Sequence, residues 1–161
     1  MANNTENSHS EIVEVVTDGS QNLMRWEPVV GTEFLNFLKH VNIPEESKNN
    51  LTRETQRILG RCTPPTLETG EETGLVVGYV QSGKTLSFTA VSALARDNKI
   101  PILIVMAGIS VPLARQSGER LKQDLRLDER SDRSWQQFNT NNPSWKDSED
   151  ALRRIIAAWK D

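Results

Sequence analysis

The residues best suited to chemistry in this sequence form one glycine-rich segment, Gly78-Tyr79-Val80-Gln81-Ser82-Gly83-Lys84-Thr85. It fills every position of the pattern G-x-x-x-x-G-K-[ST], in which backbone N–H groups surround a phosphate and a following helix points its positive end at the anion. Gly78 and Gly83 permit this close approach of the backbone. Lys84 can reach the β- and γ-phosphates in a catalytic role, and the Thr85 hydroxyl can ligate Mg²⁺. The segment therefore predicts a site for ATP and Mg²⁺.

The elements expected around this segment are those that the motif requires. Residues 75–80 are apolar and β-branched, as in a buried parallel strand, and residues 84–96 resemble a helix that packs on a sheet. After a turn, residues 100–107 form a second apolar run. Strand, helix and strand make one βαβ unit. We therefore predict the α/β fold class, with a RecA-like, helicase-type P-loop NTPase core of parallel strands that is incomplete and is preceded by a small helical segment.

The chain before this core is predicted to form two helices. Apolar residues recur at helical spacing from Thr32 to Val41. A second helix is expected from Glu45 to Leu59, with Gly60 as its stop. Residues 11–16 fit either a short strand or the start of a helix. The predicted division is a disordered terminus (1–10), a helical segment (11–62), a linker (63–74) and a partial P-loop core (75–161).

Two further helices are expected in the last third of the chain. Ser110 is a plausible N-cap and Pro112 suits a first helical position, so a helix should run to about Arg126. The charged residues that follow it fit a solvated loop. Ser148 can then cap a final helix with an apolar side.

Composition excludes several classes of protein. The formal net charge of −3 argues against a wholly basic nucleic-acid coat protein. The first ten residues lack the features of a secretory signal, and no stretch reaches the roughly 20 apolar residues of a membrane helix. We therefore expect a cytoplasmic protein. Cys62 has no partner for an internal disulfide, and with only His9 and His40 beside it there is no cluster to hold zinc.

The amino-acid sequence of the loop, with Gly-Tyr-Val-Gln-Ser at residues 78–82, resembles the P-loop of helicase-like ATPases that carry a putative endonuclease "Z-one" domain. Such ATPases occur in bacterial restriction and phage-defence systems. The resemblance covers about residues 45–125 and implies a superfamily-two helicase motor with ATP, Mg²⁺ and DNA as ligands. It also implies nuclease or other defence subunits as partners. Arg115 and Gln116 would lie where such helicases touch a nucleic-acid strand, although an ordinary exposed helix face explains them more simply.

The sequence departs from this pattern in one respect. ATP hydrolysis needs an acidic residue at the end of another strand to hold Mg²⁺ and orient water, and no apolar run after Ala107 ends in such a residue. Asp18, which follows Val15-Val16-Thr17, leaves a rearranged order of elements open. On the resemblance, we expect the acidic motif, the second motor lobe and the arginine finger to lie beyond Asp161. The chain would then be an amino-terminal fragment that does not turn over ATP alone.

Three functions remain open at this point. The first is an ATP-driven DNA translocase or helicase subunit. The second is a nucleotide-binding assembly module without turnover, whose amino-terminal helices dock a partner. The third is a small nucleotide kinase or GTPase, which ranks lowest because the chain has no guanine-reading motif such as Asn-Lys-x-Asp.

Overall fold

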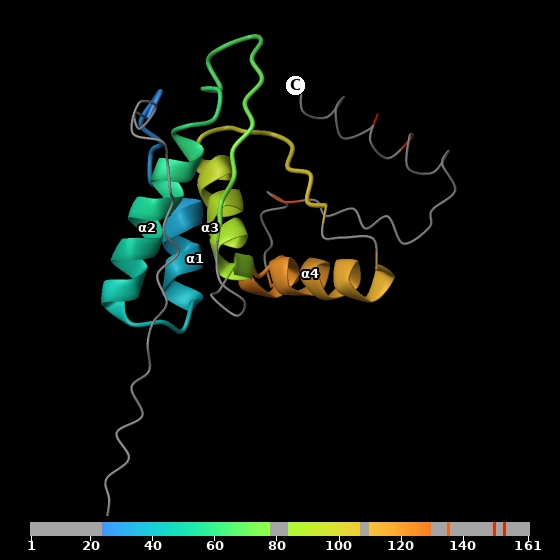
Figure 1. Cartoon of the computed structure of the whole chain (residues 1–161). Helices are drawn as coiled ribbons and strands as arrows, with labels where there is room; N and C mark the ends of the chain where they lie inside the picture. The colour runs from blue at the N-terminus through green and yellow to red at the C-terminus, as the bar shows by residue number, and fades with distance from the viewer. Residues whose placement is uncertain are drawn as a thin grey trace, which may run out of the picture.

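The structure is a computed structural model that describes residues 24–77, 84–106 and 110–129, together with Trp135, Asp150 and Arg153. The described part contains four helices: α1 (Thr32–His40), α2 (Glu45–Leu59), α3 (Lys84–Asp97) and α4 (Val111–Asp124). Helices α1, α2 and α3 run side by side, whereas α4 lies crosswise and contacts α3 (Figure 1). Among the described residues, no helix is long and apolar enough to cross a bilayer.

The ends of these helices follow from local sequence chemistry. Helix α2 has the predicted bounds, with Pro44 as its N-cap and Gly60 as its C-cap. Gly60 donates its N–H to the Gln56 carbonyl at 2.8 Å, and a Cβ atom there would lie 2.7 Å from the Trp26 carbonyl oxygen. Helix α4 carries Pro112 in its first turn, where the missing N–H costs no hydrogen bond. Four of the predicted helices are therefore present near their predicted bounds. The fifth, after Ser148, falls outside the described residues except for Asp150 and Arg153, and residues 1–23 fall outside them altogether.

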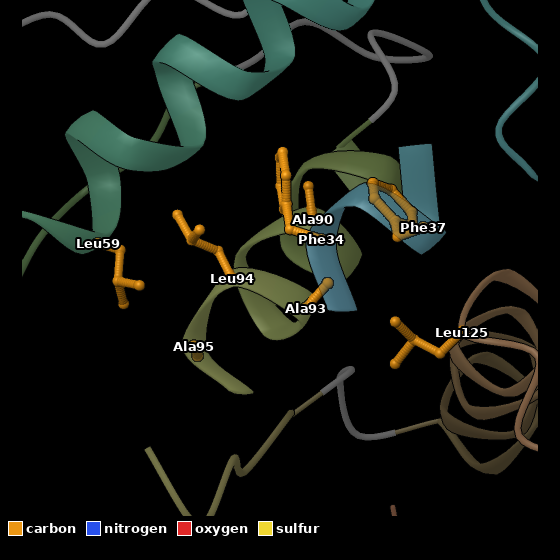
Figure 2. Close-up of a cluster of buried hydrophobic side chains, with 8 residues drawn as sticks. All are labelled: Phe34, Phe37, Leu59, Ala90, Ala93, Leu94, Ala95 and Leu125. Carbon is orange, nitrogen blue, oxygen red and sulfur yellow. The ribbon is translucent and has the colours of Figure 1, made fainter. Parts of the chain in front are cut away.

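The core surrounds α3 (Figure 2). Ala90, Ala93 and Leu94 of α3 have no exposed surface, and Phe34 of α1 is equally buried. The full cluster consists of Phe34, Phe37, Leu59, Ala90, Ala93, Leu94, Ala95 and Leu125. The alanines of α3 let neighbouring helices approach closely, and both α1 and α2 pack against it. Helix α3 is thus the central element of the described fold.

The prediction of an α/β core with parallel strands is wrong for the described residues, which form helices and no strand. Residues 75–77 and 101–106, which were expected to lie in buried strands, are irregular in structure. Among the described residues, they take part in no backbone hydrogen bond. Residues 75–77 and 102–106 are exposed by 38 % to 92 %. Residues with β-branched side chains favour an extended backbone. A sheet also requires a neighbouring strand to pair with, and the described residues supply none.

Candidate functional site

The predicted phosphate-binding loop lies directly before α3. Residues 78–83 fall outside the described residues, and Lys84 is the first residue of the helix. A helix that begins at this position has free N–H groups and the positive end of its dipole at the end of the loop. No acidic side chain lies in the first turn of α3 to compete for those groups. The helical half of the motif's expected setting is therefore present, whereas residues 75–77, the described part of the expected preceding strand, form no strand.

Thr85 is the one motif residue whose side chain the structure describes. It is half-buried in the first turn of α3, and its carbonyl accepts a 2.9 Å hydrogen bond from the Thr89 hydroxyl. Ser92 makes the same kind of bond to the Phe88 carbonyl at 2.8 Å. These bonds satisfy polar hydroxyls that are almost fully buried among the helices. The first turns of α3 are therefore held by packing as well as by the helix ladder.

The opposite end of α3 holds the start of α1. The Asp97 carboxylate accepts hydrogen bonds from the backbone N–H groups of Gly31 (2.9 Å), Glu33 (3.0 Å) and Phe34 (2.9 Å). These N–H groups have no acceptor within α1, because its N-cap, Gly31, has no side chain. Asp97 therefore caps α1 from a different helix. We refer to Asp97, Asn98 and the backbone of residues 29–34 as the clamp.

Asn98 extends the clamp by one residue. Its side-chain oxygen accepts the Val29 N–H at 2.8 Å, and its side-chain nitrogen donates to the carbonyls of Val29 at 3.0 Å and Leu94 at 2.7 Å. One amide thus satisfies both backbone groups of Val29, as a neighbouring strand would. Since Asn98 is itself buried, these bonds also remove the cost of burying its polar atoms.

A close backbone approach at Gly31 makes the clamp possible. A Cβ atom at this position would lie 2.5 Å from an Asp97 oxygen, well inside van der Waals contact. Glu33, next to it, is buried and accepts a 3.0 Å hydrogen bond from the indole nitrogen of Trp135. The start of α1 is therefore fixed by residues that follow it by more than 60 positions.

Arg115 and Gln116, the predicted nucleic-acid contacts, lie in the first half of α4 and are both exposed. Farther along, Lys122 pairs with Asp128 at 2.9 Å, and this contact raises the pKa of the lysine. The pKa of Asp124 is raised by burial, with a smaller opposing influence from Arg120. The charges near the end of α4 are thus partly engaged within the chain, whereas Arg115 and Gln116 face solvent.

The sequence correctly predicted the start of the helix at Lys84, but it missed the clamp. Asp97 and Asn98 belong to the turn that the sequence predicts between the helix at 84–96 and the apolar run at 100–107, and no further role was predicted for them. One signal was available: Gly31 precedes a helix without offering the side-chain acceptor that an N-cap usually provides. That feature indicates that the N–H groups need an acceptor from elsewhere, although it does not identify the acceptor.

Comparisons with known proteins add no further assignment. No protein-family model matches the chain, and searches of characterised proteins and of solved structures likewise found no match.

Proposed function

We propose that the segment from Gly78 to Thr85 binds the phosphates of ATP together with Mg²⁺. The supporting observation is that α3 begins at Lys84, so the free N–H groups of its first turn follow the glycine-rich segment directly. In this proposal Lys84 contacts the β- and γ-phosphates and Thr85 ligates the metal through its hydroxyl. Backbone N–H groups of Tyr79, Val80, Gln81 and Ser82, between Gly78 and Gly83, complete the cradle.

We further propose that the chain serves as the ATP-binding part of a helicase-like, DNA-dependent ATPase in a restriction or phage-defence system, acting with nuclease or other defence subunits. This second proposal depends on the resemblance of the sequence at residues 78–82 to the P-loop of that family. Arg115 and Gln116 are exposed on α4 and are therefore free to meet a DNA strand. The cytoplasm is the compartment in which such a system works.

A second candidate is an assembly module that binds nucleotide without turning it over. The exposed apolar residues at 102–106 favour it, because large exposed apolar surfaces on soluble proteins commonly mark interaction sites. ATP turnover that is stimulated by DNA favours the motor. Nucleotide binding with neither turnover nor a DNA effect favours the module.

The first experiment is calorimetric titration of Mg²⁺–ATP into the wild-type chain and into Lys84→Ala. Charge-assisted contacts are worth about 1.5–3 kcal/mol, so Lys84→Ala should lose roughly tenfold to hundredfold in affinity. Lys39→Ala is the matched control, since Lys39 is an exposed lysine in the last turn of α1 and should keep wild-type affinity. Equal affinities in wild type and Lys84→Ala, with both folded by circular dichroism, would refute nucleotide binding at this loop.

A further inference from the structure

We draw no further inference here: the strongest candidate, the exposed apolar run at residues 102–106 between α3 and α4, carries none because nothing in the described part of the chain shows what covers it.

Discussion

The three packed helices and the two exposed apolar runs, at residues 75–77 and 102–106, contain similar apolar residues, but these are buried in the helices and exposed in the runs. In α3, Leu94 and its alanine neighbours are fully buried between α1 and α2, whereas Ile104 and Met106, only a few residues farther along the chain, face solvent. A helix satisfies its backbone hydrogen bonds internally, so it needs only an apolar partner surface. An extended segment needs a second strand for its backbone as well. Apolar composition alone therefore does not determine burial.

The largest expected effect contrasts one residue from each region. Leu94→Ala should lower the free energy of unfolding by about 2–5 kcal/mol, because it removes buried methyl groups and leaves a cavity. Ile104→Ala should change it by less than about 0.5 kcal/mol, since Ile104 is 83 % exposed and there is little burial to lose. Urea denaturation followed by circular dichroism measures both. Comparable losses would show that residue 104 is buried in solution and that the contrast between the regions is incorrect.

A smaller effect concerns association rather than unfolding. Met106 is 92 % exposed within a run whose backbone forms no hydrogen bond to another described residue, and such segments promote edge-to-edge contact between chains. The wild-type chain should show a mass that rises with concentration in light scattering, and Met106→Lys should reduce that rise. Met24→Lys, a change at an exposed methionine near α2, should not. A wild-type chain that stays monomeric at all concentrations would contradict the role given to the run.

The smallest expected effect concerns the reactivity of Cys62, which lies just after α2. Burial raises the pKa of the Cys62 thiol, and the nearby Glu72 carboxylate raises it further. Because the thiolate is the reactive form, Cys62 should react with iodoacetamide more slowly than free cysteine near pH 8.5. Glu72→Gln should lower the pKa and speed the reaction by less than about fivefold, since one interaction between partly exposed groups is worth at most about 1 kcal/mol. No change in rate would mean that Glu72 does not act on the thiol.

Local features were predictable from the sequence, and features that depend on distant residues were not. The start of α2 after Pro44 and its end at Gly60 were predicted from these residues and their immediate neighbours. The start of α3 at Lys84 was likewise predicted, which places the candidate loop directly before a helix. The strands expected at residues 75–80 and 100–107 are absent from their described parts, residues 75–77 and 100–106, because pairing requires a second segment, which residue composition does not supply. The clamp was missed because 63 to 66 residues separate Asp97 from the N–H groups that it binds.

That separation also sets an order of folding during synthesis. Helix α1 leaves the ribosome before its capping carboxylate has been made, and at about 5–20 residues per second the delay is roughly 3 to 13 s. A nine-residue helix is too short to persist alone over that interval. Helix α1 therefore stays unformed until the turn at Asp97 and Asn98 has emerged, and α1 and α3 then form together rather than in the order of translation.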